Sequence, residues 1–375
     1  MAVNVYERLA HFLDDLPCGY PRTQSGVELR ILRRLFTLEE AELAMVLSLI
    51  PEEARVIARR ADLPVSVVVQ RLGEMEEKGL IFALHSRDRP PQYMATQFAV
   101  GFFEYQVNKL DEELVRDLEE YFPVVFRHDL WQKSPQLRTV PIGESIDAQL
   151  EAMDYERAEI LVRAQHKFSV APCVCRQERG LLGDACDKPL EVCMAFGAGA
   201  EFYIQNNMGR AVTLAEALDV LVQAEEAGLV LQPSNSRDAA FLCACCGDCC
   251  QVLVNVKRHP KPASIMASAF VAALDREVCD GCGTCETRCQ MEAISVDNGH
   301  AALDLDRCIG CGLCVSTCPT GAISLARKPE AEQPFVPKDF VDANIRLGQA
   351  RGKLGKADLI GMMVRSKVDS LLAPR

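Results

Sequence analysis

The chain has 375 residues, of which 49% are hydrophobic and 25% charged, and its formal net charge is -12. This length and composition indicate two or three globular domains and exclude wholesale disorder or a fibrous repeat. The acidic balance would repel a phosphate backbone, so nucleic-acid binding would need a local basic patch. One feature departs from an average globular protein, namely the count of 18 cysteines.

The cysteines are strongly grouped along the chain. Cys18 stands alone, and the other 17 all lie between Cys173 and Cys318. A secreted disulfide scaffold spreads its cysteines through a short chain, which is not the pattern here. The first residues lack the features of a secretory signal, and no apolar window approaches the length of a membrane span. We therefore expect a cytoplasmic protein without a membrane span, whose clustered thiols bind metal.

The first part of the chain predicts helices followed by a hairpin. Apolar side chains recur at helical spacing over 39–50, a second helix is predicted from Pro51, and a third ends at Gly79 as a C-terminal cap. Two strands flank the turn at 85–91. Three helices and a two-stranded wing resemble a winged helix-turn-helix domain over residues 28–100.

That resemblance implies DNA binding, but the third helix is a poor reader of a DNA groove. It carries three glutamates against Arg71 and Lys78, whereas Arg87 and Arg89 of the following turn could contact phosphates. Winged helices also serve as packing modules, and we do not expect nucleic acid to be a partner. The alternative, a redox-sensing DNA-binding regulator, stays open.

The middle of the chain alternates helices with cysteine groups. Amphipathic helices are predicted over 106–122 and 147–164, and a short strand over 167–172 leads into Cys173. A capping box formed by Thr213 and Glu216 begins a further helix. This helix is a spacer that can bring the cysteines before it next to those after it.

The central cysteines form two groups with nine thiols in total. They are Cys173, Cys175, Cys186 and Cys193, followed by Cys243, Cys245, Cys246, Cys249 and Cys250. Adjacent cysteines point in different directions, so a single site cannot easily use both, whereas two neighbouring clusters can. We predict one or two further iron-sulfur clusters here. Structural zinc is the alternative, and Arg176 either stabilises a reduced cluster or is only a surface charge.

The sequence Cys245-Cys246-Gly247 adds a partial resemblance. Heterodisulfide reductase subunits also contain Cys-Cys-Gly and hold a non-cubane cluster that does chemistry, but their long gap to a later C-x-x-C is absent here. The region is also similar to cysteine-rich segments that precede ferredoxin domains in iron-sulfur proteins of anaerobes. An enzyme with a cluster-based active site in this region is therefore a further alternative.

The most specific motif is a repeat near the end of the chain. Residues 279–289 read CDGCGTCETRC and residues 308–318 read CIGCGLCVSTC, the same cysteine spacing at an offset of 29 residues. Gly281 and Gly283 recur as Gly310 and Gly312. Three cysteines two residues apart can wrap one face of a cubane, and the glycines let the backbone curl until its amides point at the sulfides.

This repeat resembles the bacterial dicluster ferredoxin domain, over about residues 275–326. The resemblance implies two [4Fe-4S] clusters, because the fourth cysteine of each run completes the other cluster. The implied ligands are Cys279, Cys282, Cys285 and Cys318 for the first cluster, and Cys308, Cys311, Cys314 and Cys289 for the second. The family's proline after the fourth cysteine is present as Pro319, but Gln290 replaces it in the first run. Paired zinc sites are the alternative, although they do not need this duplicated order.

Together these features predict an α+β protein that relays single electrons between redox partners. Its predicted parts are a winged-helix-like domain (1–105), a cysteine-rich cluster domain (106–270), a dicluster ferredoxin domain (271–326) and a linker with C-terminal helices (327–375). We recognise no nucleotide or flavin motif. We therefore expect a redox subunit rather than a complete enzyme, with a flavoprotein or other oxidoreductase as its partner.

Overall fold

The computed structural model describes residues 4–146 and 150–374, and its mixture of helices and strands gives the predicted α+β class. The chain divides into two compact units. The first contains the residues up to Val125, Phe202–Met208 and the segment from Asn344, and the second contains Phe126–Glu201 and Gly209–Ala343. Among the described helices none is long and apolar enough to cross a membrane. The predicted domain borders stay a prediction.

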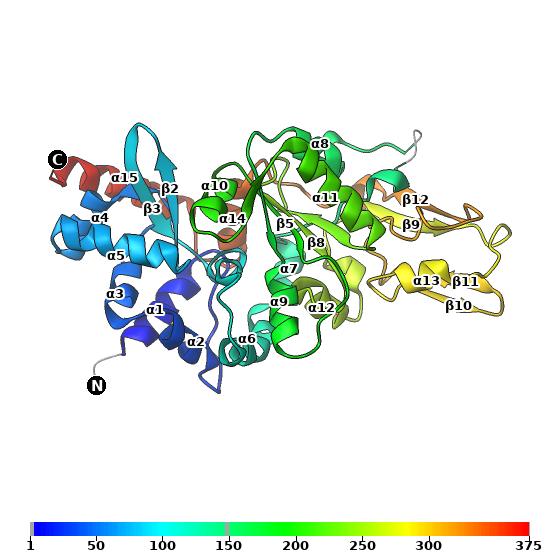
Figure 1. Cartoon of the computed structure of the whole chain (residues 1–375), viewed down its shortest axis with the longest axis horizontal. Coiled ribbons are helices and arrows are strands. Elements are labelled where there is room, and N and C mark those ends of the chain that lie inside the picture. Colours follow the sequence, from blue (N-terminus) through cyan, green and yellow to red (C-terminus); the bar gives the residue numbers. More distant parts are fainter. Residues whose placement is uncertain (1–3, 147–149, 375) are drawn as a thin grey trace. The chain divides into compact units, whose positions relative to one another are not determined.

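The first unit is built from helices around a small antiparallel sheet (Figure 1). Its strands pair in the order β1-β3-β2. They are β1 (Glu52–Glu53), β2 (Ile81–Ser86) and β3 (Arg89–Ala95). Its helices are α1 (Val5–Asp15), α2 (Val27–Leu35), α3 (Leu38–Ala44), α4 (Ala54–Ala61), α5 (Val65–Glu77), α6 (Glu112–Val125) and α15 (Lys356–Leu372).

The helix ends predicted in this unit are partly confirmed. Gly79 has a left-handed φ of 75°, and the amide of Leu80 bonds back to the Met75 carbonyl, so α5 ends as predicted. The second helix begins at Ala54 and not at Pro51, because Glu52 and Glu53 pair with β3. The prediction of a helix start at Pro51 was therefore wrong. Pairing with a strand further along the chain cannot be read from local periodicity.

A buried ion network attaches the C-terminal helix α15 to α4. Arg60 contacts Glu52 at 2.7 Å and Asp369 of α15 at 3.1 Å. Their side chains are 10%, 3% and 11% exposed, so water screens these charges little. Charge pairing thus attaches the predicted C-terminal helix to the first unit. Loss of any one partner would leave a buried charge uncompensated, which is costly.

This network predicts acid sensitivity of the first unit. Burial acts to raise the pKa of Glu52, but hydrogen bonds led by that from Arg60 outweigh it and hold the pKa below its ordinary value of 4.5. A carboxylate whose pKa is lowered in the folded state stabilises the fold at pH values above its ordinary pKa. This contribution is lost as the pH falls through the lowered pKa. Glu52→Gln should cost about 3 kcal/mol at neutral pH and weaken the acid dependence. Hydrogen exchange in α4 and α15, followed as a function of pH, measures both the loss of stability and its acid dependence. The exposed Glu42→Gln is the control. An unchanged acid dependence in Glu52→Gln would contradict it.

The second unit holds every cysteine except Cys18. Its strands are β4 (Phe168–Pro172), β5 (Glu191–Phe196), β6 (Arg210–Val212), β7 (Val230–Pro233), β8 (Phe241–Cys245), β9 (Phe270–Leu274), β10 (Ile294–Asp297), β11 (His300–Leu303) and β12 (Ile323–Arg327). Its helices are α7 (His128–Lys133), α8 (Ala158–Arg163), α9 (Val174–Leu181), α11 (Leu214–Glu226), α12 (Gln251–Lys257) and α13 (Thr284–Arg288). Two further helices, α10 (Gly197–Gln205) and α14 (Phe340–Ala350), contain residues of both units.

A five-stranded antiparallel sheet, ordered β6-β4-β5-β8-β7, positions the central cysteines (Figure 1). The predicted strand before Cys173 is confirmed as β4, and the capping box of Thr213 and Glu216 begins α11, which packs on this sheet. Cys193 lies in β5, and Cys243 and Cys245 lie in β8. Because β5 and β8 are neighbours, the sheet brings the upstream and downstream cysteines together.

Two predicted helices differ in the structure. Of the helix predicted over 147–164, only α8 and a 3-10 turn at Asp154–Glu156 form, and residues 147–149 lie outside the described residues. Glu156 pairs with Arg327 at 2.7 Å, a long-range contact that local periodicity does not reveal. The helix predicted over 106–122 is α6, which begins later because the Asp111 carboxylate accepts the amide of Leu114.

Candidate metal centres

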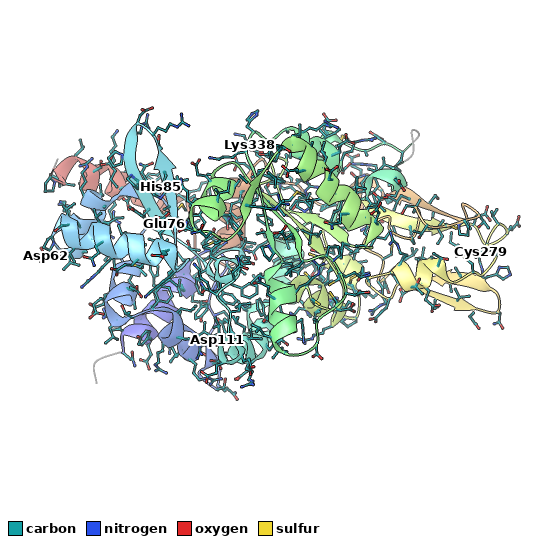
Figure 2. All side chains as sticks on the ribbon, viewed as in Figure 1. Asp62, Glu76, His85, Asp111, Cys279 and Lys338 are labelled. Atoms are coloured by element: carbon teal, nitrogen blue, oxygen red, sulfur yellow. The ribbon has the colours of Figure 1, made fainter. Side chains whose placement is uncertain are left out.

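The repeated cysteine runs lie against two antiparallel strand pairs, β9 with β12 and β10 with β11. The amide of Ala301 in β11 donates to the Cys279 sulfur at 3.4 Å, and the amide of Ala272 in β9 donates to the Cys308 sulfur at 3.3 Å. Figure 2 labels Cys279. The repeat in sequence is thus a repeat in structure. Amides that point at the sulfurs fit a negatively charged iron-sulfur cluster, since such hydrogen bonds set its potential.

The glycines of the runs are required by close backbone approach. Gly281 has a φ of 72° and Gly310 a φ of 67°, values that favour glycine. A Cβ at Gly281 would collide with the Gly299 carbonyl, and one at Gly310 with the Phe270 carbonyl. Each loop therefore curls tightly against a neighbouring strand or turn, as predicted for loops that wrap a cluster.

The thiol of Cys289 lies with the second run and not only with its own. Burial raises the pKa of Cys311 to about 12, and the nearby thiols of Cys289 and Cys308 act in the same direction. Burial and the thiols of Cys311, Cys308 and Cys289 likewise raise the pKa of Cys314. The crossed ligand set stays a prediction. The equivalent placement of Cys318 beside the first run stays a prediction, and its sulfur lies 3.7 Å from the Thr320 hydroxyl.

The two runs differ in their access to solvent. Cys282 of the first run is exposed, whereas its equivalent Cys311 in the second run is half-buried; Cys285 of the first run is as buried as Cys308 and Cys314. The segment that contains Ile142 lies against the second run, since the Ile142 amide donates to the Cys311 carbonyl at 3.1 Å. An external redox partner can therefore approach the first run more closely than the second.

Six of the nine central thiols form a continuous chain of sulfur contacts. The chain, called here the six-thiol chain, runs through Cys173, Cys175, Cys250, Cys245, Cys243 and Cys193. Hydrogen bonds from Cys175 and Cys245 hold the pKa of Cys250 well below its usual value. The same contacts raise the pKa of Cys175 and Cys245 well above the usual value, so lowered and raised thiols alternate along the chain. Grouped cysteine sulfurs are the soft donors that iron-sulfur clusters use.

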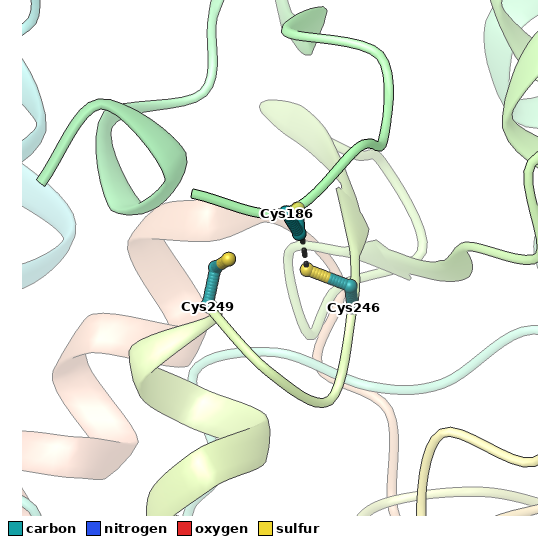
Figure 3. A group of neighbouring side chains, drawn as sticks. All are labelled: Cys186, Cys246 and Cys249. Atoms are coloured by element: carbon teal, nitrogen blue, oxygen red, sulfur yellow. Dashed lines mark hydrogen bonds between the residues drawn. The ribbon is translucent and has the colours of Figure 1, made fainter. Parts of the chain in front are cut away.

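The remaining three thiols form a separate group, called here the three-thiol site. It consists of Cys186, Cys246 and Cys249, whose sulfurs all lie within 4.8 Å of one another (Figure 3). The sulfurs of Cys186 and Cys246 are 3.9 Å apart. The adjacent residues Cys245 and Cys246 thus belong to different groups, as predicted from their side-chain directions.

Arg176 of α9 lies between the two thiol groups. Its guanidinium donates to the carbonyls of Pro189 at 2.9 Å and Ala244 at 3.0 Å, and the residue is only 5% exposed. Burial acts to lower its pKa, but the thiols of Cys173 and Cys246 oppose this and raise it. Arg176 is therefore a buried counter-charge, and its interpretation as a surface charge was wrong.

Gln290, the departure from the ferredoxin pattern, joins the repeat to the central cysteines. Its side-chain oxygen accepts a hydrogen bond from the Gly247 amide at 2.7 Å. A Cβ at Gly247 would collide with the Gln290 carbonyl, so the two loops touch through their backbones. Lys257 and Glu292 add an ion pair at 3.0 Å beside this contact. A proline at position 290 could not make the side-chain bond.

Thiols in this number and spacing define the chain as an iron-sulfur protein. Residues 272–325 match the family model of the 4Fe-4S dicluster domain. This domain and the cysteine-rich region support [4Fe-4S] clusters and a capacity for electron transfer. No significant match to the chain was found among curated proteins or among solved structures. The match covers the ferredoxin-like segment and does not extend to the central region.

Sequence reasoning missed the division of the nine thiols and the role of Gln290. The division depends on which way each sulfur points from β5, β8 and the turn before α12, and spacing alone does not fix this. The absence of proline after Cys289 was a usable signal. Proline has neither an N–H donor nor a polar side chain, so glutamine at this position adds groups that can form hydrogen bonds.

Proposed function

We propose that the protein relays single electrons from an external redox partner, through the dicluster domain, to a metal centre of the central region. When bound, a [4Fe-4S] cluster accepts and passes on one electron. The ligands proposed for the first two clusters are those of the crossed set described above. Four thiols of the six-thiol chain are proposed to hold a third cluster, since a cubane takes four.

The contact between Gln290 and Gly247 is the observation that carries this proposal. Gln290 follows Cys289, and Gly247 stands two residues after Cys245 of the six-thiol chain, so one hydrogen bond links a residue next to a proposed cluster ligand to the central cysteine loop. Within one compact unit, this contact gives electrons a short path of covalent bonds and one hydrogen bond. A ferredoxin domain tethered only by a linker would not need it.

The first cysteine run is proposed to be the entry point. Its Cys282 is exposed, and residues 277–326 contain seven acidic side chains against two basic ones. An acidic surface around an exposed redox site favours a partner with a basic docking face. A flavoprotein or other oxidoreductase with such a face is the proposed partner.

Metal analysis of anaerobically purified protein tests the relay. The proposal expects about twelve irons and twelve sulfides per chain, corresponding to three cubanes. EPR spectra of the reduced protein should then contain signals that interact across the dicluster and central regions. A content of about eight irons would confine the clusters to the dicluster domain and overturn the central part of the proposal.

Replacing Gln290 by proline tests the contact itself. Gln290→Pro supplies the residue of the ferredoxin pattern, so the dicluster domain should still load its iron. Loss of the bond to Gly247 should destabilise the contact by about 1 kcal/mol and slow reduction of the central centre. Stopped-flow absorbance after mixing with a reduced donor measures this, with the exposed Glu286→Gln as control. An unchanged rate would remove Gln290 from the path.

The N-terminal elements suggest a further proposal about architecture. We propose that helices α3, α4 and α5 with the hairpin β2–β3 form a winged-helix-like module. The ion network between α4 and α15 supports a packing role, because it uses Arg59 and Arg60 within the protein. We also propose a cytoplasmic location, since reduced thiols persist there.

A further inference from the structure

The three thiols Cys186, Cys246 and Cys249 are close enough to share one metal ion, because their sulfurs all lie within 4.8 Å of one another. In a tetrahedral zinc site, thiolates at about 2.3 Å from the ion stand about 3.8 Å from one another. The sulfurs of Cys186 and Cys246 are 3.9 Å apart, close to that separation. Spacing in the three-thiol site therefore fits a single ion.

Local structure explains how these three sulfurs converge. Cys246 and Cys249 are separated by two residues in a turn that closes when the Cys250 amide bonds to the Cys246 carbonyl at 3.2 Å. This turn places both thiols on one side, and both residues are fully buried. Cys186 reaches them from the loop after α9 and is partly exposed. The site thus has two fixed ligands and one ligand on the solvent side.

Charge also fits a divalent ion. Three thiolates carry three negative charges, a divalent ion supplies two positive ones, and the neighbouring Arg176 carries one more. Arg176 also faces Cys173 of the six-thiol chain, so it offsets the remaining negative charge in part, in a buried setting where uncompensated charge is costly. Thiolates are ligands that select zinc among the common divalent ions of low redox activity.

We propose that Cys186, Cys246 and Cys249 bind one zinc ion, whose fourth position is open to a small ligand from solvent. Within the part of the chain that the structure describes, this group of mutually close donors contains only those three residues. Gly183, Asp184, Ala185 and Asp187 around Cys186 are exposed, so the open position faces solvent. Three protein ligands and one exchangeable ligand are the arrangement of zinc sites that act as Lewis acids. The inference is independent of the relay, because zinc carries no electron.

Zinc and iron contents of variants test this site. The protein should keep about one zinc per chain after a wash with EDTA, and Cys186→Ser should retain about tenfold less zinc with unchanged iron. Cys186→His should keep its zinc, because imidazole also binds zinc. Cys18→Ser, which lies in the other unit, is the control. Loss of about four irons in Cys186→Ser would overturn the proposal and assign the thiols to a cluster. Equal zinc loss in the serine and histidine variants would also overturn it.

Cobalt substitution tests the open position separately. Cobalt bound by three thiolates and water should give the visible absorption of a tetrahedral thiolate complex, and added imidazole should shift it. An absorption that imidazole does not change would show a closed site and overturn the open fourth position. Failure of the relay would instead appear in the iron content and in the kinetics of Gln290→Pro, so the two proposals fail in different measurements.

Discussion

Replacing Cys289 by alanine is expected to remove about four irons per chain and to leave the other clusters in place. Its thiol lies with those of Cys308, Cys311 and Cys314, so it is placed to complete the second site although it belongs to the first run. The loss should also stop electrons from reaching the central region, because Cys289 precedes the contact of Gln290 with Gly247. Iron analysis and EPR of the reduced variant measure both effects.

Double variants make this prediction specific to the crossed ligand set. Cys289→Ala combined with Cys308→Ala should lose the same four irons as either change alone, because both residues would serve one cluster. Cys289→Ala combined with Cys279→Ala should lose about eight. The reverse pattern would mean that each run holds its own cluster. Cys18→Ser controls for the general effect of removing a thiol.

The dicluster domain was predictable because its sequence signals lie in short stretches of the chain. Cysteine spacing, glycines such as Gly281 and Gly310, and the repeat itself are all contained in short windows, and the structure places them as the spacing requires. The same holds for the cap at Gly79 and the capping box at Thr213. Each of these signals can be recognised within a short stretch of sequence, although the contacts of Gly281 with Gly299 and of Gly310 with Phe270 form only in the fold.

Features that depend on long-range contacts were not predictable. Glu52 and Glu53 read as the start of a helix but pair with β3, and Asp369 joins a network with α4 from the far end of the chain. In the central region, the pairing of β5 with β8 and the turn before α12 decide which thiols meet. The burial of Arg176 also depends on long-range contacts. Its two carbonyl partners, in Pro189 and Ala244, come from distant segments.

Replacing Arg176 by methionine is expected to destabilise the second unit by about 3–5 kcal/mol. Methionine matches the length of the side chain but removes the charge that faces the thiols of Cys173 and Cys246. It also leaves the carbonyls of Pro189 and Ala244 without their donor. Denaturation of the metal-loaded protein measures the loss. Arg163→Met, on the exposed surface of α8, should change stability by less than about 1 kcal/mol.

The same substitution separates electrostatic from structural effects. Without the positive charge, a reduced cluster on the six-thiol chain is harder to form, so its midpoint potential should become more negative by on the order of 50–100 mV. Arg176→Lys keeps the charge but not the two-pronged geometry, so it should recover most of the potential and less of the stability. A potential that follows stability across the methionine and lysine variants would mean that Arg176 only supports packing. A potential that follows charge would make it the residue that tunes the central centre.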